Sequence, residues 1–257
     1  MLHYEISGNG KKPLVLLHGF MEDHTIWSDM ESHFSKEFTL IKIDLSGHGK
    51  SENNNAVNSM DFMAEKVKEV IEKLNLNKIN ILGHSMGGYV SLAFAEKFPE
   101  SIESLTLFFS TTLADDEEKK QIRRRSIAVI DENFETFVNA SIPNLFSNNE
   151  KDILEGKIEL AKKIAKSTNK EGVKAAQLGM AERPDRTEIL EKLEAKILII
   201  AGKYDNAVKT ENLLKALPDK TNIKTYVLDC GHCGHWEKPT ICAEIINTEL
   251  LHNLPKK

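Results

Sequence analysis

Cysteine is scarce in this sequence: its 257 residues include only three, an odd number. A small domain held together by disulfides needs several paired cysteines, so that class of protein is excluded. So few cysteines agree with a reducing compartment. The chain is instead long enough to bury one sizeable apolar core, with room for an inserted subdomain.

Long apolar runs and an excess of basic residues are also missing. No apolar stretch approaches the length of a membrane span, and the segment from Met1 to Ile6 lacks the basic and apolar regions of a signal peptide. The formal net charge is −5, with a pI of about 6.0. Binding to nucleic acid or to a membrane surface would require a basic face. We therefore expect a cytoplasmic protein that binds neither.

Short runs rich in leucine and β-branched residues recur along the chain. They are Leu14 to Leu17, Thr39 to Leu45, Ile79 to Leu82, Leu105 to Phe109, Ile197 to Ile200 and Lys224 to Leu228. Nearly continuous apolar runs are typical of strands that are buried on both faces of a parallel sheet. Helical patterns separate these runs, one of them with Ser59 placed to cap its start. The alternation predicts an α/β fold with a doubly wound, mostly parallel sheet.

One long segment interrupts this alternation. From about Thr111 to Met180 there is no convincing strand, only charged amphipathic helical patterns such as Asp115 to Ile130. A structureless loop of that length is implausible in a compact domain. We predict a helical lid over residues 111–180, inserted between two strands of a core formed by residues 1–110 and 181–257. The charge run from Asp115 to Lys120 is expected to be a solvated helix start.

The strand pattern from Ile79 to Leu82 leads directly into Gly83-His84-Ser85-Met86-Gly87-Gly88, and a helical pattern follows. A serine in such a tight strand-to-helix turn has a strained backbone and needs small residues two positions before and after it. The pattern predicts Ser85 as a nucleophile. Its oxyanion hole would use the N–H of Met86 and a second N–H from another strand end, for which we choose Phe20. We expect the nearby His18 to be a buried, backbone-bonded histidine.

Two cysteines and two histidines crowd a short segment near the C-terminus, Cys230-Gly231-His232-Cys233-Gly234-His235. These residue types suit zinc, but a tetrahedral site is normally closed by a second ligand pair, and none is present elsewhere in the sequence. We therefore predict neither a metal nor a cofactor. A serine nucleophile does need a histidine base, and both His232 and His235 follow the last strand.

Together these features resemble the α/β-hydrolase superfamily, and the resemblance spans nearly the whole chain. The motifs, in family order, are His18-Gly19-Phe20, Asp44 to Ser51, Gly83 to Gly88, Gly202 to Asp205, and Gly231 to Pro239. The family pattern places glutamate five residues and proline seven residues after the catalytic histidine, which fits His232 and not His235. The resemblance implies a triad of Ser85, Asp205 and His232, with Asp229 as the alternative acid.

The resemblance also implies a serine hydrolase that cleaves a small-molecule carboxylic ester through an acyl-serine. The chain is similar to lidded carboxylesterases, including those that cleave pimeloyl methyl esters. C–C bond hydrolases, a menaquinone-pathway synthase and a non-catalytic binding module on the same fold remain alternatives. Candidate pocket residues are His18, Gly19, His84, Arg125, Phe137, Arg183 and His235. An arginine facing Ser85 would favour a substrate carboxylate.

Overall fold

A seven-stranded sheet forms the centre of the computed structural model, which describes residues 1–149 and 151–251. The strand order is β1-β3-β2-β4-β5-β6-β7, and every neighbouring pair is parallel except β1 with β3. The strands are β1 (Tyr4–Ser7), β2 (Lys12–Leu17), β3 (Phe38–Ile43), β4 (Ile79–His84), β5 (Ile102–Phe108), β6 (Lys196–Gly202) and β7 (Ile223–Leu228). The predicted doubly wound, mostly parallel sheet is confirmed; residues 252–257 of the predicted core lie outside the described residues.

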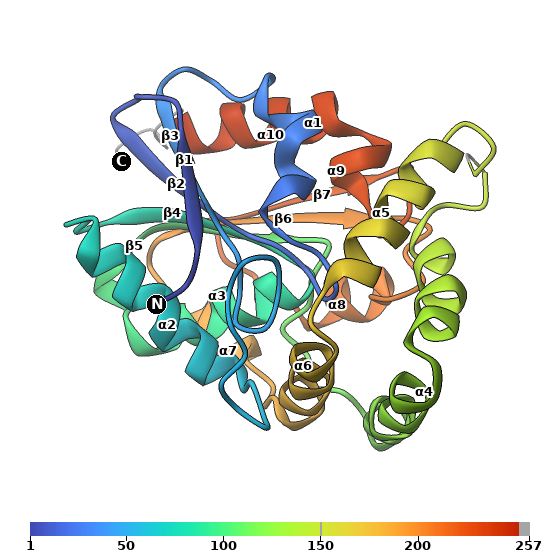
Figure 1. Cartoon of the computed structure of the whole chain (residues 1–257). Helices are drawn as coiled ribbons and strands as arrows, with labels where there is room; N and C mark the ends of the chain where they lie inside the picture. The colour runs from blue at the N-terminus through green and yellow to red at the C-terminus, as the bar shows by residue number, and fades with distance from the viewer. Residues whose placement is uncertain (150, 252–257) are drawn as a thin grey trace.

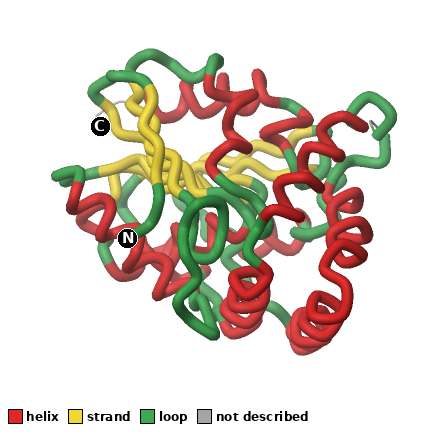
Figure 2. The backbone as a smooth tube through the Cα atoms, viewed as in Figure 1, coloured by secondary structure: helices red, strands yellow, loops and turns green. Residues whose placement is uncertain are grey.

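Helices cover both faces of this sheet (Figures 1 and 2). The helices and 3-10 turns are η1 (His24–Trp27), α1 (Ser28–Glu31), α2 (Met60–Lys73), α3 (Met86–Lys97), η2 (Pro99–Ser101), α4 (Glu117–Ser141), η3 (Ile142–Leu145), α5 (Glu155–Ser167), α6 (Lys170–Glu182), α7 (Thr187–Lys192), α8 (Thr210–Ala216), α9 (Gly234–Glu237) and α10 (Pro239–Leu251). The predicted Ser59 cap is present, because its side chain accepts a hydrogen bond from the Phe62 N–H. None of the described helices has the length and apolar character needed to span a membrane.

The alternation of side chains along each strand divides the core into two layers. In β2, Val15 and Leu17 pack into the layer that contains α2 and α3, whereas Leu14 and Leu16 pack into the layer that contains α1 and α10. Successive side chains of a strand point to opposite faces, so a continuous apolar run supplies both layers. This is why the central strands are nearly continuous runs of apolar residues.

Strand β7 departs from the sequence-based expectation. Only β6 pairs with it, and the side chains of Lys224, Thr225 and Val227 are exposed. The interpretation of this run as a strand buried on both faces is therefore wrong. A strand at the edge of a sheet need not be buried on both faces, and an exposed lysine such as Lys224 discourages pairing with further chains.

Between β5 and β6 the described chain contains no strand and forms α4, η3, α5 and α6, which we call the insertion. The insertion lies at one end of the sheet (Figure 1). Its two ends meet: the N–H of Arg186 donates to the carbonyl of Thr112 at 2.9 Å, and the hydroxyls of Thr112 and Thr187 are 2.8 Å apart. The helical insertion between two strands is confirmed, and the division of the chain into core and lid domains stays a prediction.

The start of the insertion is less solvated than the charge run suggested. Asp116 caps α4 by accepting from the Lys119 N–H, as an acid at a helix start should. Asp115, however, is buried and pairs with Arg183 at 2.8 Å and with Arg123 at 2.5 Å. Because a buried carboxylate needs such partners, this residue ties α4 to the end of α6.

Candidate active site

Ser85 lies in the tight turn between β4 and α3, where its backbone has φ of 49°. A side chain at Gly83 would place its Cβ 2.2 Å from the carbonyl oxygen of Gly87, and one at Gly87 would lie 2.3 Å from the carbonyl oxygen of Leu17. Both distances are impossible for real side chains, so the turn can form only with glycine at these positions. The Ser85 carbonyl is held by the Ser110 hydroxyl at 2.7 Å.

Asp205 and His232 form a buried pair at the ends of neighbouring strands. Nδ1 of His232 lies 2.7 Å from Oδ2 of Asp205, and the other carboxylate oxygen accepts from the N–H groups of Ala207 and Val208, each at 2.8 Å. A carboxylate only accepts, so Nδ1 carries the proton and Nε2 is the basic nitrogen. His232 and Ser85 line one cavity. The alternative acid, Asp229, is exposed and pairs with Lys203 instead.

Two backbone N–H groups next to Ser85 are left unused. Among the described residues, no hydrogen bond uses the N–H of Phe20 or of Met86 as its donor. The peptide between Gly19 and Phe20 is held by His18, whose Nδ1 donates to the Gly19 carbonyl at 2.7 Å while its Nε2 accepts from the Leu45 N–H at 2.9 Å. Because a trans peptide directs its C=O and N–H to opposite sides, this contact fixes the direction of the Phe20 N–H.

The loop that carries His232 is organised by Glu237. The carboxylate of Glu237 accepts hydrogen bonds from the N–H groups of Gly231 at 2.9 Å, Ser147 at 3.1 Å and Cys233 at 3.2 Å. One buried side chain thus joins the histidine loop to the segment that follows η3 in the insertion. Glu237 is the glutamate five residues after His232 that the family pattern contains, and these contacts are its physical role.

The remaining histidine of the C-terminal cluster is buried elsewhere. His235 is fully buried, and neither of its ring nitrogens has a hydrogen-bond partner among the described residues. Burial and the neighbouring His84 hold its pKa well below the ordinary value, so it is neutral. The three cysteines are free thiols, and burial raises the pKa of each.

Within residues 1–149 and 151–251, two groups of side chains have donor atoms close enough to share a metal ion, and neither includes a cysteine. They are Glu22 with His84 and His235, and His3 with Glu5 and His24. In the first group Glu22 and His84 already bind each other at 2.7 Å. In the second, Glu5 also lies 3.3 Å from the Lys50 ammonium, a cation that repels another. Both groups are therefore accounted for by ion pairing and hydrogen bonding.

The cavity at Ser85 has a volume of about 510 Å³ and lies between the strand ends and the insertion. The side chains that line it come from three regions. They are Phe20, Met21, Glu22, His84, Ser85, Tyr89 and His232 of the core, Asp116, Glu118, Lys119, Ile122, Arg123, Ser126, Phe137, Ser141, Leu145, Gln177 and Met180 of the insertion, and Asn206, Ala207 and Lys209. Such an apolar wall with a few polar groups is typical of small-molecule sites.

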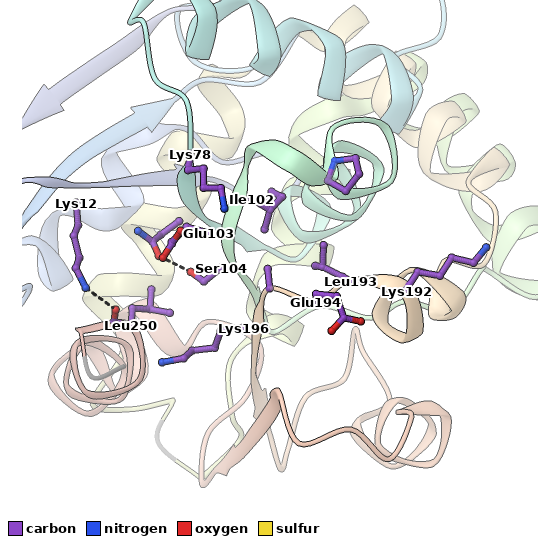
Figure 3. Close-up of a pocket in the computed structure, with 13 residues that line it drawn as sticks. Lys12, Lys78, Ile102, Glu103, Ser104, Lys192, Leu193, Glu194, Lys196 and Leu250 are labelled. Carbon is purple, nitrogen blue, oxygen red and sulfur yellow. Dashed lines mark hydrogen bonds between the residues drawn. The ribbon is translucent and has the colours of Figure 1, made fainter. Parts of the chain in front are cut away.

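A second cavity, of about 540 Å³, lies at the opposite edge of the sheet (Figure 3). Its lining comes from the starts of strands, including Lys12, Lys196 and Ser104. The Ser104 hydroxyl donates to Asn80, and no histidine lines this cavity. Ligands of open parallel sheets bind at the carboxyl ends of the strands, where Ser85 lies, so the first cavity is the candidate site.

Of the pocket residues expected from the sequence, His84 and Phe137 line the cavity at Ser85. His18, Gly19 and His235 do not line it; Gly19 and His235 instead lie next to the lining residue His84. Arg183 is buried, packs on the ring of Tyr89 with its guanidinium carbon 3.9 Å from the ring centroid, and bonds Asp115. The prediction that Arg183 lines the substrate pocket is therefore wrong.

The prediction that Arg125 lines the substrate pocket is also wrong. Arg125 is exposed, and its side chain donates a hydrogen bond to Gln121. Arg123 lines the cavity instead, donating to Asp115 and, at 3.1 Å, to Gln177. In the same helix Ile122 is 57% exposed and Val129 43%, whereas Ile130 is fully buried. Residues seven apart share a helix face, so the buried Ile130 alone would have indicated Arg123.

Other lining residues had no signal in the sequence. Glu22, Gln177 and Asn206 come from segments that no motif marked, and only the fold brings them to Ser85. Asp44, the first residue of the family motif Asp44 to Ser51, receives hydrogen bonds from the Nδ1 and the backbone N–H of His24 and from the Lys50 N–H. It organises a turn behind the site.

Comparisons with known proteins identify the family to which the chain belongs. The model of the alpha/beta hydrolase fold family matches residues 12–239. A 2-hydroxy-6-oxononadienedioate/2-hydroxy-6-oxononatrienedioate hydrolase of Escherichia coli K12 is 27% identical over 249 residues, covering 92% of this chain and 86% of its own length. A thermophilic esterase from Thermogutta terrifontis, solved with malate bound, is 32% identical with a TM-score of 0.90, over 97% of this chain and 93% of the esterase.

An enol-lactonase from Burkholderia xenovorans LB400 superimposes with a TM-score of 0.88 at 21% identity, over 98% of this chain and 96% of its own. At that level of identity the likeness concerns the fold alone.

Proposed function

Because the chain belongs to the α/β-hydrolase fold family and is a hydrolase of that family, we propose that it cleaves a small-molecule carboxylic ester through an acyl-serine on Ser85. The observation that carries this proposal is the shared cavity of Ser85 and His232, together with the 2.7 Å contact of His232 to Asp205. A serine hydroxyl is a weak nucleophile until such an oriented histidine accepts its proton.

The proposed reaction proceeds in two halves. The Ser85 oxygen attacks the ester carbonyl while its proton moves to Nε2 of His232, and the N–H groups of Phe20 and Met86 stabilise the oxyanion. His232 then protonates the leaving alcohol as the C–O bond breaks. Water loses a proton to His232 and attacks the acyl-serine, and the returned proton regenerates the Ser85 hydroxyl as the acid leaves.

The cavity wall favours an acyl group of modest size. Phe137 and Leu145 of the insertion and Met180 of α6 supply apolar surface on one side. A volume of about 510 Å³ suits a substrate of small-molecule size. We therefore expect short and medium acyl chains to react faster than long ones.

Turnover of p-nitrophenyl acyl esters tests the proposal. Wild type and Ser85→Ala should be compared over short and medium chains, with circular dichroism to establish that both are folded. We expect the substitution to lower kcat by about 10⁴-fold or more, as removal of a triad serine does elsewhere. An alanine variant as fast as the wild type would exclude Ser85 as the nucleophile, and inactivity of folded wild type on every ester would exclude the esterase proposal.

A second candidate function is hydrolysis of a C–C bond in a substrate that carries a carboxylate. Arg123 supports this candidate, because this residue lines the cavity and a guanidinium pairs with carboxylates. The name of the Escherichia coli relative describes cleavage of dienedioates, which carry two carboxylates. Cleavage of a vinylogous 1,5-diketo acid that depends on Ser85, with esters unreactive, would favour this candidate over the esterase.

A further inference from the structure

A single carboxylate oxygen lies at the junction of the loops around Ser85. Oε2 of Glu22 accepts a hydrogen bond from the Gly19 N–H at 2.6 Å and another from Nδ1 of His84 at 2.7 Å. The Glu22 side chain is 9% exposed and that of His84 only 1%. A buried carboxylate is costly unless it is paired in this way, so the pair is built into the fold.

The other nitrogen of His84 faces an oxygen too. Nε2 lies 3.0 Å from the backbone carbonyl of His232. A carboxylate and a carbonyl can only accept, so both nitrogens of His84 must donate and the ring is an imidazolium. Burial opposes this charge, but Glu22 outweighs it and the pKa of His84 is raised. Burial would likewise raise the pKa of Glu22, yet His84 lowers it to about 2.

This chain of contacts joins three segments far apart in the sequence. It begins at the N–H of Gly19, the residue before Phe20, passes through His84, the residue that precedes Ser85, and ends at the backbone carbonyl of His232. Gly19 leaves just enough room, because a Cβ there would lie 2.7 Å from Oε2 of Glu22 and 2.8 Å from Nδ1 of His84. The residue at position 19 must therefore be glycine for the pair to sit where it does.

We infer that Glu22 and His84 are positioning residues, which hold the Phe20 N–H and His232 in register with Ser85. This inference rests on the proposed function of Ser85 and His232. Neither side chain needs to touch the substrate's reacting bond for this role. Loss of the pair would let the oxyanion donor and the base drift apart, and a misplacement of about 1 Å can cost on the order of 100-fold in rate.

The pair also balances charge when the base is protonated. The rings of His84 and His232 have centroids 5.0 Å apart, so acylation places a second imidazolium beside the first. Glu22 and Asp205 supply one negative charge for each. Other titratable groups near the pair are His235, whose Nε2 is 3.7 Å from Oε1 of Glu22, and His18, His48 and Cys233.

The substitution Glu22→Gln tests the inference because it keeps the shape of the side chain and removes its charge. We expect kcat for p-nitrophenyl esters to fall by about 100-fold with KM changed by less than about threefold, because the loss concerns the transition state. Affinity for a trifluoromethyl ketone, which mimics the oxyanion, should fall in parallel with kcat/KM. Glu65→Gln removes an exposed partner of Lys97 and is the matched control.

Each outcome of this comparison decides the matter. A folded Glu22→Gln variant with kcat and ketone affinity within about threefold of the wild type would overturn the inference. So would a fall in activity that appears entirely in KM. The Ser85→Ala variant, assayed in parallel, separates failure of the proposed function from failure of this inference.

A measurement on the wild type keeps the inference testable if the variant does not fold. Nitrogen-15 NMR of histidine-labelled protein at pH 7 reports whether each ring nitrogen carries a proton, and His84→Gln assigns the signal. We expect both nitrogens of His84 to be protonated, with a downfield proton on the nitrogen that faces Glu22. A neutral His84 ring would overturn the inference regardless of any activity.

Discussion

The backbone N–H of His232 donates a hydrogen bond of 2.7 Å to the carbonyl oxygen of Leu145. Leu145 ends η3 in the insertion, and its side chain also lines the cavity. The residue before His232 is also in close contact with the insertion, because a Cβ on Gly231 would lie 2.5 Å from the backbone nitrogen of Ser147. The proposed base is therefore bonded directly to one wall of the substrate cavity. A hinge that opens the insertion without displacing His232 would have to lie outside this contact.

Asp205→Asn should inactivate the protein while leaving it folded. The amide cannot hold His232 in the tautomer with Nδ1 protonated, so we expect kcat to fall by about 10³-fold or more. Ester turnover together with thermal unfolding measures the effect. Asp229→Asn, which removes an exposed partner of Lys203, is the control and should keep wild-type kcat. A slow Asp229 variant beside a fast Asp205 variant would reverse the assignment of the acid.

Two glycine substitutions should have opposite effects on stability. Gly87→Ala forces a Cβ to within 2.3 Å of the Leu17 carbonyl, so the strand and helix must separate and we expect loss of several kcal/mol or failure to fold. Gly156→Ala meets nothing and lies in α5, so it should stabilise by about 0.5–1 kcal/mol. Chemical denaturation of both variants checks this, and a tolerated Gly87→Ala would contradict the tight turn at Ser85.

Arg123 and Arg125 offer a matched pair for substrate recognition. Arg123→Gln should raise KM by about tenfold for an ester that carries a second carboxylate, with less effect on neutral esters of the same length. Arg125→Gln should change neither value, because Arg125 is exposed and lies outside the cavity lining. Steady-state kinetics on the two substrate series decides the point. Equal losses on both series would mean that Arg123 acts only through its contacts with Asp115.

Asp115 should make the protein sensitive to acid. Burial alone would raise the pKa of Asp115, but Arg183 and Arg123 lower it to about 2. A carboxyl with a depressed pKa stabilises the folded state above its unfolded pKa of about 3.8, and this contribution is lost as the pH falls toward 2. Asp115→Asn should cost about 3 kcal/mol at pH 7 and much less near pH 2. Urea unfolding at both pH values measures the difference, and a cost independent of pH would be inconsistent with the ion pairs.

The three thiols should be inert in the folded protein. Cys230, Cys233 and Cys242 are buried, and burial raises the pKa of Cys242 to about 12. Because only a thiolate reacts, Ellman's reagent at pH 8 should label no cysteine in the native state and all three in guanidinium chloride. Rapid labelling of the folded protein would contradict this arrangement.

Sequence patterns were sufficient to predict a structural feature where the contacts that fix it are mostly local. The turn around Ser85 is of this kind, because its glycines are required by contacts within that turn and with the next strand. The pairing of His232 with Asp205 followed from the family pattern. Glu22, Arg123 and the burial of Asp115 could not be predicted, because each depends on which residues the fold brings together from distant segments. The wrong prediction that β7 is buried on both faces has the same cause, because the order of the strands in the sheet decides which strand lies at its edge.

Thr112 and Arg186, which join the two ends of the insertion, have a consequence for how such a protein diversifies. Much of the segment between them can be exchanged at this junction, provided that the Leu145 carbonyl and the Ser147 N–H keep their bonds to the histidine loop, while α7 still carries the chain back to β6. Sequence changes within the insertion would alter the cavity wall while Ser85 stays in place. Descendants of this chain can therefore acquire different substrates without having to reinvent their chemistry.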